Sequence, residues 1–79
     1  MFDQVTKIEF NGKTYNQKHG NAFDRGSADS YYGRNRNPHK GGVGGDSGPR
    51  IDDLTAFEIE AYQAGYDYNE QHGGKKDYD

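Results

Sequence analysis

Two short strings with the same pattern of small and aromatic residues constrain this chain most. Residues 22–26 read AFDRG and residues 61–65 read AYQAG, so each places an alanine, an aromatic residue and a glycine at the same spacing. Small residues at helical spacing let two helix backbones approach closely, as is well known in membrane helices. We therefore predict an antiparallel helix pair that touches near Gly26 and Gly65. Coincidence between two short strings is the alternative.

The clearest helix signal lies in the second half of the chain. Thr55 and Glu58 have the spacing of a capping box, in which each side chain accepts from a backbone N–H of the other. Gly73 is suited to end a helix. These signals predict a helix near residues 55–72. Its apolar stripe would hold Phe57, Ala61, Ala64 and Tyr68.

A first helix and a long connector precede that segment. Asn21 can cap a helix and Gly33 can end one, which predicts a helix near residues 21–33. Residues 34–50 are glycine-rich and contain both prolines of the chain. Because glycine is costly to order, we expect a flexible loop there, with much of residues 40–49 mobile.

The N-terminal segment has the pattern of a β-hairpin. Residues 5–16 read VTKIEFNGKTYN, in which strand-forming residues flank Asn11-Gly12, the strongest short hairpin signal. An isolated hairpin is only marginally stable, so we expect this one to pack on the helices. The predicted cross-strand partners are Phe10 with Lys13 and Ile8 with Tyr15.

The length and composition allow one small α+β domain over residues 1–79, ending in a charged tail at 74–79. Only 29% of the residues are apolar, but seven tyrosines and four phenylalanines can build a small core. A bare helical hairpin with a disordered N-terminus is the alternative. The absence of cysteine and of any long apolar run predicts a cytoplasmic protein with no membrane segment.

The charge is distributed unevenly along the chain. Residues 1–50 carry eight Lys and Arg against five Asp and Glu, whereas residues 51–79 carry two against eight. The two parts could attract each other or present faces of opposite sign to partners.

No enzyme, cofactor site or metal site is predicted. The three histidines, His19, His39 and His72, have no metal-ligand spacing, which favours three surface histidines. The glycine run at residues 41–46 lacks the strand and helix that a dinucleotide-binding loop needs, so it is interpreted as a connector.

The best candidate contact surface is the aromatic and basic segment at the end of the first helix. Tyrosine and arginine are typical of binding surfaces, and arginine can bind a carboxylate or phosphate through two N–H groups. The alternative places both tyrosines in the core and pairs Arg25 or Arg34 with Asp67 or Glu70. The predicted contact residues are Tyr31, Tyr32, Arg34, Arg36, His39 and Lys40.

Three parts of the sequence together resemble known small proteins. The runs FDRGSADSYYGR at residues 23–34 and AYQAGYD at 61–67, with Pro38-His39 between them, resemble small uncharacterised bacteriophage proteins. More distantly, residues 22–69 are similar to ribosome modulation factor, which joins two short helices through an Asn-Pro turn. That family is strongly basic, whereas this chain carries a net charge of −3. The bacteriophage resemblance implies an accessory protein that acts on host machinery in the cytoplasm of a bacterial host cell.

Three functions follow as hypotheses. The first is a non-catalytic protein that binds and modulates a host protein complex, and the second is an RNA- or ribosome-binding factor. The third is an acidic nucleic-acid mimic that inhibits a host nuclease or defence complex through Glu60, Asp67 and Glu70. The sequence does not indicate an oligomeric state.

Overall fold

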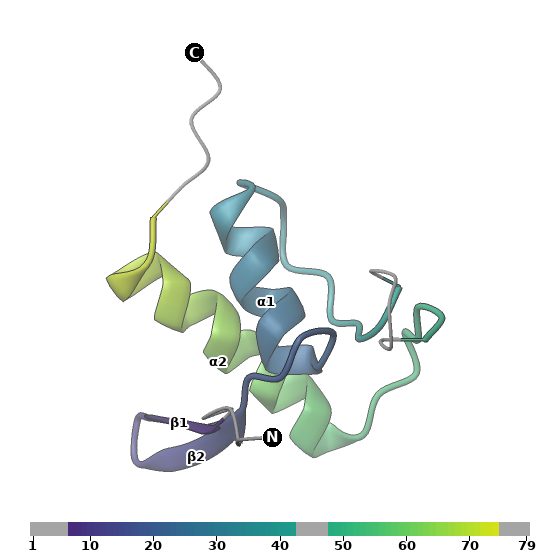
Figure 1. The fold of residues 1–79 in the computed structure, drawn as a ribbon, viewed down its shortest axis with the longest axis horizontal. Helices are drawn as coiled ribbons and strands as arrows, with labels where there is room; N and C mark the ends of the chain where they lie inside the picture. The colour runs from purple at the N-terminus through teal and green to yellow at the C-terminus, as the bar shows by residue number, and fades with distance from the viewer. Residues whose placement is uncertain (1–6, 43–47, 75–79) are drawn as a thin grey trace, which may run out of the picture.

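The computed structural model describes residues 7–42 and 48–74 and places a two-stranded hairpin beside two packed helices (Figure 1). This arrangement confirms the predicted small α+β fold. The elements, in chain order, are β1 (Lys7–Phe10), β2 (Lys13–Asn16), α1 (Ala22–Tyr31) and α2 (Ala56–His72).

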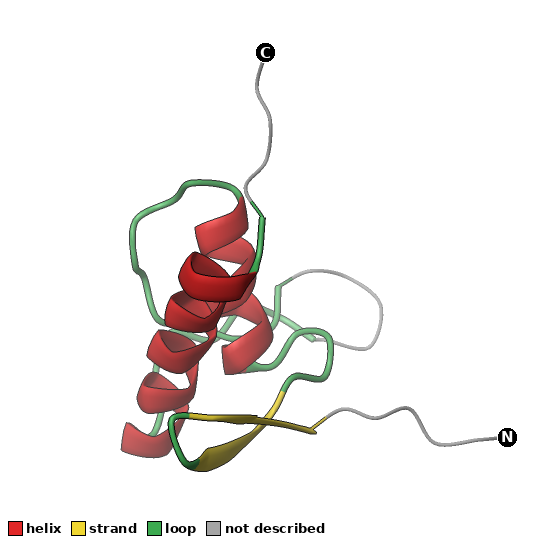
Figure 2. Ribbon diagram, turned by 90° about the vertical axis from the view of Figure 1, so that its left-hand side faces the viewer, coloured by secondary structure: helices red, strands yellow, loops and turns green. Residues whose placement is uncertain are grey.

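The hairpin forms in the predicted register. Asn11 and Gly12 adopt φ values of 54° and 78°, as the tight hairpin turn requires, and Ile8 pairs with Tyr15. The buried rings of Phe10 and Tyr15 attach the hairpin to both helices. Figure 2 shows the two strands lying beside the helices. Phe10 meets Tyr68 edge to face at 5.5 Å between ring centroids, and Tyr15 stacks on Phe23 at 5.5 Å.

The two helices touch at the two predicted glycines. A Cβ atom at Gly26 would lie 2.0 Å from the carbonyl oxygen of Tyr62, and one at Gly65 would lie 2.0 Å from that of Phe23. Such distances leave no room for a side chain, so each glycine admits the backbone of the other helix. The predicted close contact is confirmed.

The predicted antiparallel direction of the helices is wrong. Phe23 meets Gly65 near the start of α1, and near its end Ser30 accepts from Asn69 at 3.0 Å. Figure 1 shows both helices running from the lower to the upper part of the molecule, so α1 and α2 cross while running in the same general direction.

The long connector explains this direction. A short loop makes neighbouring helices antiparallel, but the segment between Tyr31 and Ala56 is long enough to return to the beginning of α1. Midway, the N–H of Gly41 donates to the carbonyl of Gly20 at 2.7 Å. Figure 1 shows the connector descending from the end of α1 to the level at which α2 begins.

Hydrogen bonds hold the described part of the connector. Lys40 and Ile51 exchange two backbone hydrogen bonds of 3.0 and 2.8 Å, and Gly42 N–H donates to the carbonyl of Gly48 at 2.9 Å. Residues 43–47 lie outside the described residues, as do residues 5–6 of the predicted hairpin and 75–79 of the predicted tail. The mobility expected for residues 40–49 stays a prediction.

The helix ends agree with the predicted signals except at Asn21. The capping box of α2 is complete, since Glu58 N–H donates to Thr55 Oγ1 at 3.1 Å and Thr55 N–H donates to Glu58 Oε1 at 2.9 Å. Asn21 occupies the N-cap position of α1, but its side chain makes no cap hydrogen bond. Instead, the Asp24 carboxylate accepts from the N–H of Gly20 at 2.9 Å.

The core is small and mainly aromatic. Tyr62 is completely buried, and Phe23 lies beside it in the same cluster. Phe57, expected on the buried stripe of α2, is instead 59% exposed because it lies in the first turn, beyond the helix crossing. Neither described helix is long and apolar enough to cross a bilayer.

Candidate functional site

A buried polar cluster joins both helices to the connector. The Asp29 carboxylate, on α1, accepts a hydrogen bond from the Tyr62 hydroxyl, on α2. The same hydroxyl accepts from the backbone N–H of Asn37 at 2.9 Å. Burial, and then the hydrogen bond to Asp29, raise the pKa of Tyr62 far above its ordinary value. The hydroxyl therefore keeps its proton and fixes the start of the connector.

His39 belongs to this cluster and not to the surface. It is only 6% exposed, and its Nδ1 lies 2.7 Å from the carbonyl oxygen of Asn37 and 3.9 Å from Asp29 Oδ2. The prediction of three surface histidines is therefore wrong for His39, because the connector folds back over α2. His19 and His72 are exposed as expected.

A cavity of about 340 Å³ opens beside this cluster. Arg34 Nη1 lies 3.4 Å from Asp29 Oδ1, and Arg50 Nε donates to Asp52 at 2.8 Å. The cavity therefore has a buried carboxylate on its wall and two partly exposed guanidinium groups. Its lining residues are Asp29, Arg34, Asn35, Asn37, His39 and Arg50.

Tyr31 and Tyr32 face outward next to this cavity. They are 40% and 38% exposed, and their rings meet edge to face at 5.0 Å between centroids. The Arg34 guanidinium lies 4.8 Å from the centroid of the Tyr32 ring. The alternative that placed both tyrosines in the core is wrong, because the core face of α1 is occupied by Phe23 and Gly26.

Arg36 and Lys40, also predicted to contact a partner, are paired with α2. Arg36 donates to Asp67 at 2.5 Å and to Gln63 at 2.6 Å, and Lys40 forms an ion pair with Glu58. The hydrogen bonds from Lys40 and from the Thr55 backbone hold the pKa of Glu58 below its ordinary value. The predicted contact set thus divides into outward, paired and buried residues.

The predicted acidic face is also paired within the molecule. Glu60 accepts from Lys13 at 2.7 Å and from the Tyr15 hydroxyl at 3.0 Å, and these bonds hold the pKa of its carboxyl below the ordinary value. Glu70 accepts from the Ser30 hydroxyl at 2.6 Å. The hydrogen bonds of Glu60 attach the hairpin to α2, and that of Glu70 attaches α1 to α2.

The ion pairs predicted for Arg25 and Arg34 with α2 are not those observed. Arg25 lies 3.3 Å from Asp24, and Arg34 approaches Asp29, so both arginines find carboxylates within or beside α1. Arg36 takes the expected place opposite Asp67, since the connector passes over α2 at this point.

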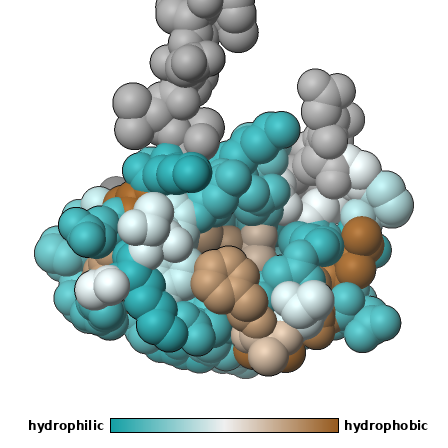
Figure 3. Space-filling model, turned by 90° about the horizontal axis from the view of Figure 1, so that it is seen from below, coloured by the Kyte–Doolittle hydropathy of each residue, from teal (hydrophilic) through white to brown (hydrophobic). Residues whose placement is uncertain are grey.

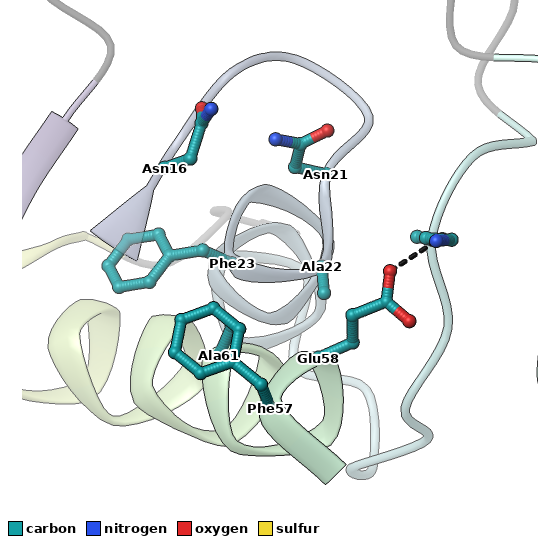
Figure 4. Close-up of a pocket in the computed structure, with 8 residues that line it drawn as sticks. Asn16, Asn21, Ala22, Phe23, Phe57, Glu58 and Ala61 are labelled. Carbon is teal, nitrogen blue, oxygen red and sulfur yellow. Dashed lines mark hydrogen bonds and ion pairs between the residues drawn. The ribbon is translucent and has the colours of Figure 1, made fainter. Parts of the chain in front are cut away.

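A second pocket, of about 250 Å³, lies where α1 begins and crosses the first turns of α2. Figure 4 shows the rings of Phe23 and Phe57 beside one another, with the amides of Asn16 and Asn21 near them and the carboxylate of Glu58 joined to Lys40. Figure 3 shows apolar colour on part of one face, surrounded by hydrophilic side chains.

Sequence reasoning missed Asp29, Asn37, Tyr62 and Arg50 as parts of one site. Their common feature is that the connector brings them together from separate segments. The one sequence feature that could have indicated this site is that two predicted contact residues, Arg34 and His39, lie on either side of Asn37-Pro38. Among the described residues, no group of three His, Cys, Asp or Glu side chains could hold a metal ion.

The chain matches no family model, no curated protein and no solved structure. The resemblances to bacteriophage proteins and to ribosome modulation factor therefore stay predictions from the sequence.

Proposed function

We propose that this chain is a non-catalytic binding protein that occupies a surface of a bacterial host protein complex. Its contact surface is the tyrosine face, defined as Tyr31, Tyr32 and Arg34. The observation that carries the proposal is the exposure of two adjacent rings, 40% and 38%, beside a guanidinium group. Aromatic and arginine side chains dominate the binding energy of many protein interfaces, which supports a protein partner.

The intramolecular ion pairs favour a protein over RNA. Arg36 and Lys40 already have carboxylate partners, so a phosphate group would have to displace Asp67 or Glu58. Affinity for RNA depends on the number of phosphates that free basic groups neutralise. The net charge of −3 further opposes approach to a polyanion.

The same reasoning weakens the nucleic-acid mimic. Glu60 and Asp67 face Lys13 and Arg36, and Glu70 accepts from Ser30. A mimic presents free negative charge to a basic partner, but these acids serve contacts between the elements of the fold.

Affinity capture from bacterial lysate tests the proposal. The tagged chain is expected to retain one host complex, which is then purified for measurement of the dissociation constant. Replacing Tyr31 and Tyr32 together by alanine should weaken binding at least about tenfold, because each ring is expected to contribute 1 kcal/mol or more.

Phe57→Ala supplies the matched control, since Phe57 is another exposed ring, at 59%, on a different part of the surface. It should bind like the parent. Equal binding by the tyrosine variant and the parent would contradict the proposal. Capture that nuclease abolishes, and that declines steeply with salt, would instead indicate RNA binding.

A further inference from the structure

We propose that the cavity beside the tyrosine face binds one carboxylate side chain, aspartate or glutamate, of a peptide segment in the partner. That the carboxylate comes from a protein partner rests on the proposed function. Carboxylate binding by the cavity can be tested without that partner. The guanidinium groups of Arg34 and Arg50 would hold the carboxylate, and His39 lines the same cavity.

Both guanidinium groups keep donors that the fold does not use. Among the described residues, Arg34 donates only through Nη1, at 3.4 Å to Asp29, and Arg50 only through Nε, to Asp52. A guanidinium has five N–H donors arranged to meet a carboxylate. The side chains are 59% and 45% exposed, so a ligand can reach them from solvent.

His39 adds a ring nitrogen on the cavity wall. Its side chain is 8% exposed, and Nδ1 is held by the carbonyl oxygen of Asn37 at 2.7 Å. Within residues 7–42 and 48–74, Nε2 has no hydrogen-bond partner. Because Nδ1 donates to that carbonyl, Nε2 of the neutral ring is an acceptor, so His39 lines the site and Arg34 and Arg50 supply the donors.

The charge of the cavity favours a single carboxylate. Arg34 and Arg50 contribute two positive charges and Asp29 one negative charge, while Asp52 lies beside Arg50 at the outside. The cavity therefore has at most one net positive charge with His39 neutral. One carboxylate matches this charge, whereas a dianionic phosphate would be left partly uncompensated next to Asp29.

Arg34 links the cavity to the tyrosine face. Its guanidinium lies over Tyr32, at 4.8 Å from the ring centroid, and also lines the cavity. A partner segment could therefore place an acidic side chain in the cavity and an adjoining apolar side chain on the rings. The expected epitope is an acidic residue next to an apolar one.

The test is an NMR titration of the full chain with the peptide Ac-Gly-Asp-Gly-NH₂. The Nε–H signals of Arg34 and Arg50 and the ring signals of His39 should shift and saturate. The matched peptide Ac-Gly-Asn-Gly-NH₂ has the same shape without the charge, and it should give no saturating shift.

Variants locate the binding. Arg50→Gln should weaken binding of the acidic peptide at least fivefold, whereas Arg36→Gln, which removes an arginine outside the cavity, should leave it within twofold. If Arg50→Gln alters the amide spectrum as a whole, Arg34→Lys replaces it, because lysine keeps the charge and loses the two-donor geometry. A fivefold loss is again expected.

Three results would overturn the inference. The Asp and Asn peptides could shift the same signals equally, Arg36→Gln could weaken binding as much as Arg50→Gln, or inorganic phosphate could saturate the site at a lower concentration. If the titration fails while tyrosine-dependent capture persists, only this inference is lost. If the titration succeeds and capture does not depend on the tyrosines, the proposed function is lost instead.

Discussion

The helix crossing and the polar cluster hold this small chain together by opposite means. At the crossing, side chains are absent, and the Tyr62 carbonyl lies where a Cβ of Gly26 would be. At the cluster, polar side chains are buried, and the Tyr62 hydroxyl donates to Asp29. Tyr62 takes part in both regions. With so few apolar residues, the chain gains burial from close backbone approach and from an aromatic ring whose polar end is satisfied.

Tyr62→Ala should have the largest effect, because it damages both regions at once. The side chain is completely buried, and truncation of a buried aromatic costs about 3–5 kcal/mol. Since small domains have little stability to lose, we expect the variant to lack a cooperative thermal transition. Phe57→Ala, at a ring that is 59% exposed, should melt close to the parent. A cooperative transition near the parent temperature for Tyr62→Ala would break the comparison.

Gly26→Ala tests the crossing alone. Alanine favours an isolated helix by about 1 kcal/mol over glycine, so a solvent-facing site would be stabilised. At Gly26 the new Cβ would meet the Tyr62 carbonyl at 2.0 Å, so we expect a net loss of about 1–3 kcal/mol in urea unfolding.

Gly74→Ala is the matched control, since a Cβ there meets nothing within 4 Å. It should change the free energy of unfolding by less than about 0.5 kcal/mol. Stabilisation by Gly26→Ala would show that the helices do not touch at this residue.

The two regions differed in how far the sequence could predict them. The crossing follows from glycine spacing within each helix, and the hairpin register follows from Asn11-Gly12, so both were accessible from local patterns. The direction of the helices was not, because two similar strings carry no information about orientation. The connector settles the direction by returning to Gly20.

The polar cluster depends on that same return. His39 is buried because the connector folds over α2, and Arg50 reaches the cavity from the far side of the glycine-rich segment. No local spacing relates these residues to Asp29. The exposure of Tyr31 and Tyr32 was one of two alternatives that the sequence left open, and the occupation of the core face of α1 by Phe23 and Gly26 decides between them.

Tyr62→Phe isolates the polar region. The ring stays in the core, but Asp29 loses a buried donor and the Asn37 N–H loses its acceptor. We expect a loss of about 1–3 kcal/mol in urea unfolding. Tyr66→Phe, which removes a more exposed hydroxyl that donates to the Arg34 carbonyl, should cost less. An equal loss in the free energy of unfolding for the two variants would show that the buried hydrogen bond of Tyr62 contributes no more to stability than the exposed one of Tyr66.

The smallest effect belongs to the exposed contacts that attach the hairpin to α2. Hydrogen bonds from Lys13 and then Tyr15 hold the pKa of Glu60 below its ordinary value of 4.5. Because the folded pKa is the lower one, the contribution of Glu60 to stability is present above pH 4.5 and is lost as the pH falls through the folded value. We therefore expect the urea midpoint of the parent to decline between pH 5 and pH 3 more than that of Glu60→Gln.

Lys13→Gln removes the main donor to the same carboxylate, so it should reduce this decline as Glu60→Gln does, and combining the two should add little. Added salt should reduce the difference between parent and variants, since exposed pairs are screened. An undiminished decline in both variants would assign the acid sensitivity to other carboxylates, with Glu58 and its Lys40 contact the first to examine. The exposed contacts would then add nothing measurable to a fold held by its crossing and its buried cluster.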